Sequence, residues 1–504
     1  MKILILEHPR ISSATRFNDI ANAPLWSCLL AGYAASALLA AGHEAEIIDA
    51  QKNRWNFQKT KKEIIRTAPA LLLINAVYFW EHTDKFFDFL AELRAAGYLG
   101  HINLFGFFPT LAWNPILKHS QAVDSIATGE PEHILVELAD RLQLKKAWQN
   151  IPGLGHKTDG IVKYNGFRKP EKNPDLFSFP VRNDDAGETA TILASRGCYN
   201  ACSFCPVPSF YNNGPLWRGR TPSNILEEIS QLYDQGRREF YFIDPNFVGP
   251  GIKGRRRIFE LAEQLQKMDI TYGIETRPND LNDTIMAALV SSGLKSLLLG
   301  IESGSSDILD GMGKHSSRTI SENAIEICRL AGLEPEVGFL MFVPDSRIED
   351  IERNFSFLKQ NMLLDRLDRT VNLLSHYQIV LMGTPGYQLF KNRDILVQKG
   401  PLGFEADILY RSRRVKWLRD VMVEVCRYIL KIMSEKTSPV YWKKSDQKKH
   451  FTVNNFIVNL FYDLLQQATR EKKLPSAALL AVDLKKDLNN LIRNEDFQKK
   501  AALV

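Results

Sequence analysis

Short apolar runs alternate with helix-length segments over residues 1 to about 142. The strand-like runs are KILILE (2–7), AEIIDA (45–50), LLLINA (71–76), INLFGF (102–107) and AVDSIATG (122–129). Segments of helical length lie between them, including one that begins at Pro24 and one at Pro131. Parallel strands joined by helices give this rhythm, so it predicts a doubly wound parallel sheet. Ligands of such sheets bind at the carboxyl ends of the strands.

A second alternation begins at TATILAS (189–195) and predicts a partial parallel barrel. The further strand candidates are EFYFID (239–244), ITYGIET (270–276), KSLLLGIE (295–302), EVGFLMFV (336–343) and TVNLLSHYQIV (370–380). Helices are expected from about Pro222, Arg255, Leu281, Ser317 and Arg347. Six successive strand–helix units indicate a barrel more open than the eight-unit form, with its active site at the carboxyl ends of the strands.

The remaining segments differ in composition from both alternations. Residues 143–188 are rich in Pro, Gly, Asn and Asp and predict a linker with a small hairpin. Residues 401–504 are helical in pattern and richer in Lys and Arg. The sequence therefore predicts an α/β protein with an N-terminal Rossmann-like domain (1–142), the linker, a (β/α)6 barrel (189–400) and a helical C-terminal region.

Composition and charge exclude several classes of protein. The chain has 504 residues, of which 45% are hydrophobic and 24% charged, and this balance is typical of a soluble globular protein. Its formal charge of +6 is spread over short basic clusters, KGRRR (253–257), YRSRRVK (410–416) and KKSDQKK (443–449). A nucleic-acid partner would need a continuous basic stripe, so we expect none. We interpret the clusters as solvated faces, with an anionic partner or a membrane surface as the alternative.

One charge-free segment, residues 23–42, is long enough to span a membrane. It is rich in Ala, Gly and Ser, and a strand follows it directly, so we expect a helix packed on a sheet and no transmembrane segment. The six cysteines do not form a disulfide framework, because three of them are crowded together. This cysteine usage favours a reducing, cytoplasmic location.

The crowded cysteines are Cys198, Cys202 and Cys205, which form C-x3-C-x2-C within SRGCYNACSFCPVP (195–208). Three thiolates can bind three irons of a 4Fe-4S cluster and leave the fourth iron open. A structural zinc site needs four protein ligands, usually as cysteine pairs, and no second pair is present. A catalytic nucleophile does not require three thiols at this spacing. The motif therefore favours an open-corner cluster.

The motif and its surroundings resemble the radical S-adenosylmethionine (radical SAM) superfamily. The similarity covers roughly residues 190–360 and includes WRGRTPSNILEEI, FYFIDPNF, IETRPNDLNDTIMAALVSSGLKSLLLGIESGS and FLMFVPDSRIEDIERNFSFL. It implies that the open iron binds the amino and carboxylate groups of S-adenosylmethionine. One electron from the cluster then cleaves the sulfonium to methionine and a 5'-deoxyadenosyl radical. An electron donor such as flavodoxin or ferredoxin is expected.

The resemblance also implies cofactor-binding roles for residues at the strand ends. These are Phe204 beside the adenine, Asp244 and Asn246, Glu275 and Arg277, and Glu302 and Ser303. Arg277 can bind a carboxylate through two hydrogen bonds, and a structural ion pair is its alternative role. His376 and Tyr377 on the sixth predicted strand are candidate catalytic residues, because His titrates near neutrality and Tyr can relay a hydrogen bond. Neighbours on a strand point to opposite sides, so only one should face the lumen.

The N-terminal domain resembles the cobalamin-binding, class B methylase-like subgroup of this superfamily. The matching stretches are residues 23–50, FGFFPTLAWNPIL (105–117) and ATGEPEHILVEL (127–138). The resemblance implies that the corrin contacts Gly106, Thr110, Gly129 and Glu130. The D-x-H-x-x-G motif is absent, so no histidine is expected on cobalt, and His8 and His101 are expected to be core or surface groups. Phe107 and Phe108 replace a common Gly and His, and either pack on a corrin or fill its space.

The leading hypothesis is cobalamin-dependent C-methylation of an unactivated carbon in a small-molecule, natural-product or lipid-like substrate. The alternative enzyme performs radical dehydration, cyclisation or rearrangement, with no cobalamin in the N-terminal domain. Methylthiotransferases that modify tRNA need three further upstream cysteines, and only Cys28 is present. An iron-sulfur electron carrier or regulator would leave the GIESGS and ETRPND motifs without a role. We expect the C-terminal helices to cap the barrel, with membrane-surface contact as the alternative.

Overall fold

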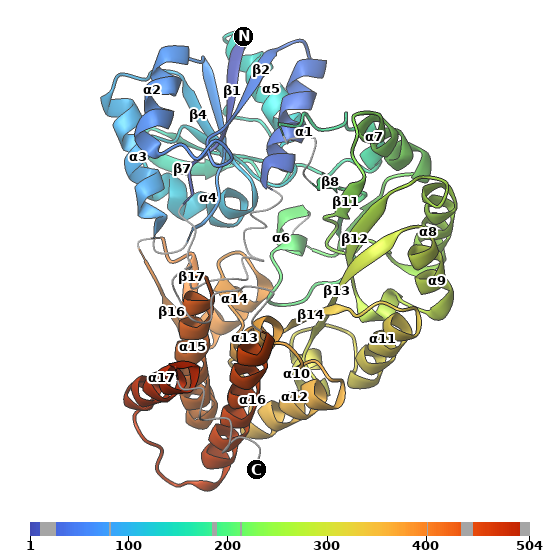
Figure 1. Cartoon of the computed structure of the whole chain (residues 1–504). Helices are drawn as coiled ribbons and strands as arrows, with labels where there is room; N and C mark the ends of the chain where they lie inside the picture. The colour runs from blue at the N-terminus through green and yellow to red at the C-terminus, as the bar shows by residue number, and fades with distance from the viewer. Residues whose placement is uncertain are drawn as a thin grey trace.

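The chain consists of an N-terminal α/β domain, a second α/β domain and a C-terminal helical region (Figure 1). The computed structural model describes residues 1–10, 27–79, 82–183, 189–211, 214–400, 402–434 and 447–493. The first residues of the helix predicted from Pro24, and residues 443–446 of the basic cluster, lie outside the described residues.

A seven-stranded sheet in the order β2-β1-β3-β4-β5-β6-β7 forms the N-terminal domain. Its strands are β1 (Lys2–Glu7), β2 (Glu44–Asp49), β3 (Leu71–Asn75), β4 (His101–Phe105), β5 (Ser125–Ala127), β6 (Leu154–Thr158) and β7 (Ile161–Tyr164). The first five run parallel, and β6 and β7 form an antiparallel hairpin that extends the sheet. The predicted doubly wound sheet is confirmed. The hairpin expected in the linker is part of this sheet.

Both faces of this sheet are covered, because alternate strand residues point to opposite sides. Leu4 and Leu6 pack with α2 (Phe57–Thr67), α3 (Asp84–Ala95) and α4 (Phe107–His119). Ile3 and Ile5 pack with α1 (Ser27–Ala40) and α5 (Glu132–Gln143). From Ser27 to Ala40 the charge-free segment is therefore a helix packed on a sheet, as predicted. No helix in the described ranges is both long and apolar enough to cross a membrane.

The second domain is built on a five-stranded parallel sheet in the order β14-β13-β12-β11-β8. Its strands are β8 (Ala190–Ile192), β11 (Glu239–Phe242), β12 (Thr271–Thr276), β13 (Leu294–Glu302) and β14 (Glu336–Phe339). The helices on its outer side are α7 (Pro222–Asp234), α8 (Gly251–Leu265), α9 (Asp283–Ser291), α11 (Arg318–Leu330) and α12 (Ile348–Gln360). The predicted helix starts are therefore confirmed to within a few residues.

An antiparallel hairpin follows β8 that the sequence did not predict. It pairs β9 (Ser195–Cys198) with β10 (Leu216–Gly219), and α6 (Val207–Tyr211) lies between the two strands. The cysteine motif begins at the end of β9. In Figure 1, α6 lies inside the curve of the second sheet, on the side that faces away from α8 and α9.

The strand predicted over residues 370–380 is wrong for its first half. Helix α13 covers Leu367–Ser375, and its buried residues Leu367, Val371 and Leu374 follow the helical spacing of four and three. Tyr377 is joined to Phe342 by an isolated parallel bridge. Among the described residues, the sheet has no sixth strand beyond this single bridge.

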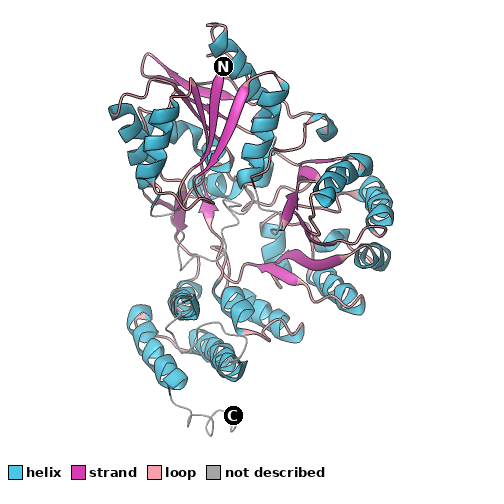
Figure 2. Cartoon of the chain, turned by 45° about the horizontal axis from the view of Figure 1, so that its top comes forward, coloured by secondary structure: helices cyan, strands magenta, loops and turns pink. Residues whose placement is uncertain are grey.

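The C-terminal region begins with a small sheet and ends in three long helices. The sheet has the order β15-β17-β16 (Val380–Leu381, Glu405–Ile408 and Leu396–Gln398) and carries α14 (Pro385–Asn392). The helices are α15 (Arg413–Ser434), α16 (Gln447–Arg470) and α17 (Ala477–Arg493), and their apolar faces join the core of the second domain. Figure 2 shows the two large sheets side by side, with these helices at the lower end of the molecule.

Candidate functional site

The loop between β9 and α6 carries the three cysteines, and each of them is free. Cys202 is buried, whereas Cys198 and Cys205 are partly exposed. No three His, Cys, Asp or Glu side chains of the described residues converge as ligands of a single metal ion. This geometry does not fit zinc, which needs its ligands around one point. It is compatible with a 4Fe-4S cluster, because there each thiolate binds a different iron.

Backbone and side-chain hydrogen bonds fix this loop in place. The Ser203 amide donates to the Met312 carbonyl at 2.8 Å, and the Ser203 carbonyl accepts from the Gly386 amide at 2.7 Å. Asn200 Nδ2 lies 3.1 Å from the sulfur of Cys202 and 3.0 Å from the carbonyl oxygen of Gly313. The sequence did not single out Asn200, whose amide links the cysteine loop to the turn after α10 (Ser306–Gly311).

Burial raises the pKa of all three thiols, so each is protonated without a metal. The nearby charges of Arg277 and Lys314 act in the opposite direction and lower the pKa of Cys198 and Cys202. A thiolate is the form that binds iron, and these cations favour it. The surroundings therefore suit a ligand set that becomes anionic when metal is bound.

Lys314 is a further candidate that sequence analysis missed. Its side chain is 5% exposed, and its Nζ lies 3.0 Å from Oε1 of Glu302. Burial disfavours the ammonium, but Glu302 and Cys202 together raise the pKa of Lys314. Glu302 has a φ of +70° at an irregularity in the pairing of β13 with β14. A non-glycine residue in this left-handed region is uncommon, and such conformations concentrate at functional sites.

Ser303 and Phe204 make contacts other than this ion pair. Ser303 is fully buried and donates to Oδ1 of Asn354 on α12 at 2.7 Å. Phe204 packs against an apolar cluster that includes Met312 and Leu340. Ser303 therefore links β13 to α12, and Phe204 anchors the cysteine loop.

Asn246 joins the strand ends to the cysteine loop through Asp280, which the sequence also did not single out. Asn246 Nδ2 donates to Oδ2 of Asp280 at 2.8 Å, and Tyr199 donates its hydroxyl to Oδ1 at 2.7 Å. Asn246 Oδ1 accepts from the Thr276 hydroxyl at 2.8 Å. The polar groups of Asn246 are thus used within the protein, next to the residue that follows Cys198.

Two buried acids lie at the ends of β11 and β12. Asp244 accepts from the Ala194 amide at 3.0 Å through Oδ2, and burial raises its pKa to about 6. Its Oδ1 has no hydrogen-bond partner among the described residues. Burial raises the pKa of Glu275 to about 7, although a hydrogen bond from the Tyr241 hydroxyl at 3.2 Å opposes this. Tyr241 and Glu275 point away from the outer helices, because their strand neighbours are in the core those helices cover.

Within the part of the chain that the structure describes, Arg277 does not form the ion pair that was its structural alternative. Its guanidinium donates to the backbone carbonyl of Lys314 and lies over the Tyr199 ring, 4.8 Å from the ring centre. Arg277 therefore holds the turn that carries Lys314 against the cysteine loop. This leaves Lys314 as the cation whose side chain pairs with an acid of the site.

His376 and Tyr377 point in different directions, as expected of neighbours. Burial lowers the pKa of His376, and the nearby Glu302 carboxylate partly opposes this shift. The Tyr377 hydroxyl accepts from Arg427 of α15 at 3.2 Å, and its ring faces Arg419. The sequence predicted that both residues lie on a strand. This is wrong, because they directly follow α13, which ends at Ser375. His376 is beside the strand-end site, and Tyr377 contacts the C-terminal helices.

The predicted corrin-contacting positions lie together at the carboxyl ends of β4 and β5. Gly106 precedes α4 with a φ of +108°, and a Cβ there would lie 2.4 Å from Oδ1 of Asn75. The Thr110 hydroxyl accepts from the Gly129 amide at 3.0 Å. A Cβ on Gly129 would lie 3.2 Å from the carbonyl oxygen of Phe210 on α6. This edge therefore packs closely on the segment that follows the cysteines.

Phe107 and Phe108 complete that packing. The Phe107 ring stacks on Phe210 with their centres 4.0 Å apart. Phe108 is buried and packs edge-on against Phe404, 4.8 Å away, and beside Tyr78. Both rings fill space between the N-terminal domain and the rest of the chain. His8 is also engaged: its Nε2 accepts from the Val77 amide at 3.1 Å, and burial lowers its pKa to about 3.

Glu130 takes part in a buried ion-pair network between the two α/β domains. Its carboxylate pairs with Arg196 of β9 at 3.0 Å and with Arg218 of β10 at 2.7 Å. Arg196 also pairs with Glu132 at 2.7 Å, and its guanidinium lies over the Phe177 ring. Arg196 is close to Cys198 in the same strand. Arg196 was not predicted from the sequence, because its partners are more than 60 residues away.

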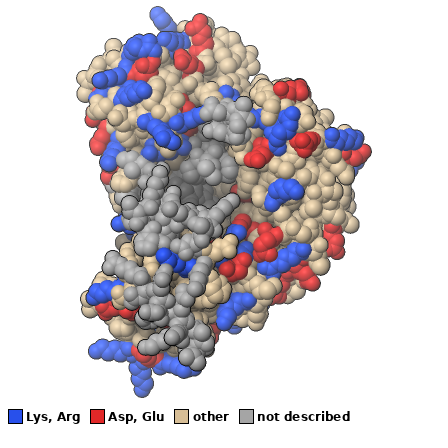
Figure 3. Space-filling view, in the orientation of Figure 1, with Lys and Arg blue, Asp and Glu red and all other residues tan. Residues whose placement is uncertain are grey.

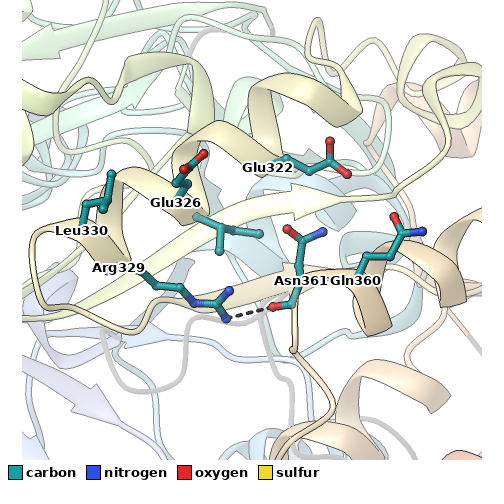
Figure 4. A pocket seen from close by; sticks show the side chains of 7 residues that line it. Glu322, Glu326, Arg329, Leu330, Gln360 and Asn361 are labelled. Atoms are coloured by element: carbon teal, nitrogen blue, oxygen red, sulfur yellow. Dashed lines mark hydrogen bonds between the residues drawn. The ribbon is translucent and has the colours of Figure 1, made fainter.

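A surface pocket of about 440 Å³ lies outside this site, between α11 and α12. Figure 4 shows its lining side chains, with Arg329 donating to the backbone oxygen of Asn361. The other lining residues are Glu322, Ile325, Glu326, Leu330 and Gln360. None of the predicted site residues lines it. The face in Figure 3 shows basic and acidic side chains interspersed among the described residues.

Residues 192–358 match the model of the radical SAM superfamily. The chain therefore contains a radical SAM domain and is an enzyme of this class, as the sequence predicted. A curated relative, the uncharacterized methyltransferase PH0819 of Pyrococcus horikoshii, is 26% identical over 375 residues, which cover 71% of this chain and 78% of the relative.

Two solved structures share the fold over nearly the whole chain. One is the cobalamin-dependent S-adenosylmethionine radical enzyme OxsB with aqua-cobalamin bound; the TM-score is 0.75 at 16% identity, over 96% of this chain and 75% of that one. The other is the radical S-adenosylmethionine methyltransferase TsrM of Kitasatospora setae; the TM-score is 0.66 at 15% identity, over 93% of this chain and 97% of that one. The predicted fold class is thereby confirmed.

Proposed function

We propose that this chain is a cobalamin-dependent radical SAM methyltransferase that acts on an unactivated carbon of a small-molecule or lipid-like substrate. The observation that carries the proposal is the group formed by the cysteine loop, the buried Lys314–Glu302 pair and the acids at the strand ends. When bound, the cluster supplies the electron that cleaves S-adenosylmethionine, and the corrin supplies the methyl group.

The cysteine loop suits a 4Fe-4S cluster with one open iron. Cys198, Cys202 and Cys205 are the cluster ligands in this proposal. Asn200 donates toward the sulfur of Cys202, and Lys314 and Arg277 favour the charge of thiolates nearby. The chemistry of this donor set therefore agrees with the group.

The Lys314–Glu302 pair suits the amino acid end of S-adenosylmethionine. A zwitterion carries one carboxylate and one ammonium, so it can exchange with a buried pair of opposite charges without leaving either charge uncompensated. Lys314 would donate to the carboxylate and Glu302 would accept from the amino group, the two groups that the open iron is expected to bind. Asp244, whose Oδ1 has no partner among the described residues, is the second acid able to accept from the amino group.

The shared fold and the names of the relatives support cobalamin binding in this proposal. OxsB, which shares the fold, was solved with aqua-cobalamin, and PH0819 is named a methyltransferase. The four residues that the resemblance suggested make other contacts: Gly106, Thr110 and Gly129 pack closely at the strand ends, and Glu130 is part of the ion-pair network. We therefore derive no step through these four positions.

A second candidate function keeps the cluster and has no corrin. It is favoured by the packing of Phe107 on Phe210 and of Phe108 on Phe404, which fills the edge of the N-terminal sheet. Such an enzyme would use the 5'-deoxyadenosyl radical for dehydration, cyclisation or rearrangement. The two candidates share every residue of the strand-end site and differ in the N-terminal domain.

His376 is the group proposed to move a proton in either reaction. Its lowered pKa keeps the imidazole neutral near pH 7, so that it can accept a proton as the product forms. Arg427 of α15 donates to the Tyr377 hydroxyl and so joins the segment after α13 to α15. His376→Gln should reduce product formation and leave cluster assembly intact.

The test of the proposal uses anaerobically purified protein from cobalamin-fed cells. Two results together would support methylation. The protein retains one corrin per chain, and a deuterated methyl group passes from labelled S-adenosylmethionine into a metabolite that is missing from cells without the gene. Failure to retain corrin, with 5'-deoxyadenosine still formed, favours the second candidate. Failure to assemble any cluster contradicts both.

A further inference from the structure

The inner face of the second sheet, on the side of α6, carries a polar cluster on β11, β12 and β13 (Figure 1). Tyr241, Gly273 and Ser296 lie side by side in register on these three strands. A Cβ on Gly273 would lie 2.6 Å from the ring carbon Cδ2 of Tyr241 and 2.3 Å from Oγ of Ser296. Because Gly273 has no side chain, the Tyr241 ring lies over it, and its hydroxyl donates to Oε1 of Glu275 at 3.2 Å.

Glu275 is a half-buried acid that has no cation beside it among the described residues. No described residue other than Tyr241 donates to its carboxyl. Besides burial, the groups that shift its pKa are Tyr241 and Asp244, and neither is a cation. Arg277, which follows on the same face of β12, donates instead to the Lys314 carbonyl. A carboxylate that is removed from water without a cation is destabilised, so Glu275 favours a positively charged ligand.

Glu275 lies apart from the ion pair proposed to bind the amino acid end of S-adenosylmethionine. It is in register with Leu298 of β13, which comes four residues before Glu302. At about 3.3 Å per residue, Glu275 is about 13 Å along the sheet from Glu302. Between them on the inner face, Gly300 of β13 is in register with Gly338 of β14. A Cβ on Gly338 would lie 3.7 Å from its nearest neighbour, so the face has room for a bound molecule between the two acids.

We infer that Glu275 and Tyr241 bind an amino group of the substrate, so that the substrate is a primary or secondary amine. The inference rests on the proposed function and narrows its substrate class. A substrate ammonium would donate to Glu275 and compensate its charge, and the half-buried Leu298 would contact the carbons beside the nitrogen. A substrate carboxylate or phosphate would instead place a second negative charge beside Glu275, and a hydroxyl would leave its charge uncompensated.

The experiment measures the 5'-deoxyadenosine formed by reconstituted, dithionite-reduced protein when an extract of cells without the gene is added. The aqueous and the chloroform-soluble phases of the extract are tested separately, which distinguishes a small amine from an amine-bearing lipid. A portion of each phase is treated with N-hydroxysuccinimide acetate, which acetylates amines and so removes their positive charge. Another portion receives the same reagent after it has been quenched, as the chemical control.

We expect one untreated phase to stimulate 5'-deoxyadenosine formation by the wild-type protein, and acetylation to abolish that stimulation. Glu275→Gln keeps the shape of the side chain and removes its charge, so half-maximal stimulation should need about tenfold more extract or higher amounts. Saturating extract should restore most of the rate, because the loss lies in binding. The control variant Glu336→Gln makes the same change on the inner face of β14, where Glu336 already pairs with Arg366, and should match the wild type.

Stimulation that survives acetylation would overturn the inference and leave the proposed function standing. Equal half-maximal amounts of extract for the wild type and Glu275→Gln would do the same. A raised KM for S-adenosylmethionine in Glu275→Gln would assign Glu275 to the cofactor and also overturn the inference. A wild-type protein that forms no 5'-deoxyadenosine, or that neither untreated phase stimulates, would remove both the inference and the proposed function.

Discussion

Replacing Arg196 with Met should loosen the contact between the N-terminal domain and the barrel. Arg196 is 3% exposed and pairs with Glu132, which is 1% exposed, at 2.7 Å. Oε2 of Glu132 has no hydrogen-bond partner among the described residues. The substitution leaves Glu132 without its cation, whereas Glu130 keeps Arg218. Removing one partner of a buried pair costs about 3–5 kcal/mol, because the other charge stays buried.

The cost should come from the orphaned charge and not from lost packing, since Met keeps an apolar chain over the Phe177 ring. The double variant Arg196→Met/Glu132→Leu removes the charge as well and should recover most of the stability. As a matched control, Arg168→Met breaks a partly exposed pair with Glu137 and should cost less than about 1 kcal/mol.

Native-state hydrogen exchange of peptides from β9 and α5 measures these changes. A loss of about 3 kcal/mol corresponds to exchange roughly a hundredfold faster, since about 1.4 kcal/mol is a factor of ten. The single variant should show this acceleration, and the double variant should exchange within about tenfold of the wild type. Equal acceleration in the single and double variants would refute the reasoning, because the cost would then lie in packing.

Three further predictions concern the site. Burial raises the pKa of Glu275 from 4.5 to about 7, so the folded protein binds a proton more tightly than the unfolded protein. The free energy of unfolding should therefore fall by roughly 3 kcal/mol as the pH rises from 4.5 to 7, at about 1.36 kcal/mol per pKa unit. Glu275→Gln should abolish this loss in urea titrations of the apoprotein at pH 5 and pH 8, and an unchanged difference would contradict the assignment. Asn200→Leu removes a hydrogen-bond donor that lies 3.1 Å from the sulfur of Cys202. Because hydrogen bonds to the sulfurs help to set the potential of a cluster, the midpoint potential of the reconstituted cluster should become more negative in a redox titration. An unchanged potential would show that the contact is not made to a cluster ligand. Electron paramagnetic resonance of the cob(II)alamin form should show no nitrogen splitting from the protein. The reason is that His8 is buried and hydrogen-bonded at both ring nitrogens. Nitrogen splitting from the protein would reveal a histidine on cobalt and contradict this prediction.

Helices and strands that show in a local pattern of apolar and polar residues were predicted from the sequence. The strands of both parallel sheets were found because apolar runs of strand length alternate with helical segments. Residues 370–380 misled the prediction, because a short apolar run fits a strand or a buried helix equally well. The actual helix shows in the spacing of Leu367, Val371 and Leu374. Cys198, Cys202 and Cys205 were recognisable because their spacing alone carries chemistry.

The residues that the sequence missed depend on contacts between distant segments. Arg196 meets Glu130 and Glu132 only because β9 lies against the N-terminal domain. Lys314 follows Glu302 by 12 residues, and nothing local distinguishes it from a surface lysine until the turn is seen to be buried. The domain boundaries and the roles of the strand-end residues remain predictions.

The central claim is that three cysteines hold a cluster that cleaves S-adenosylmethionine. The direct measurement is the iron content and 5'-deoxyadenosine yield of reconstituted, dithionite-reduced protein for each Cys→Ala variant. Cys198→Ala, Cys202→Ala and Cys205→Ala should each abolish 5'-deoxyadenosine formation. Cys328→Ala and Cys426→Ala, whose thiols are buried in the core of the second domain, should leave both quantities near the wild-type values. Loss of cluster iron in either of these two variants, or 5'-deoxyadenosine formation that survives any of the first three, would contradict the account.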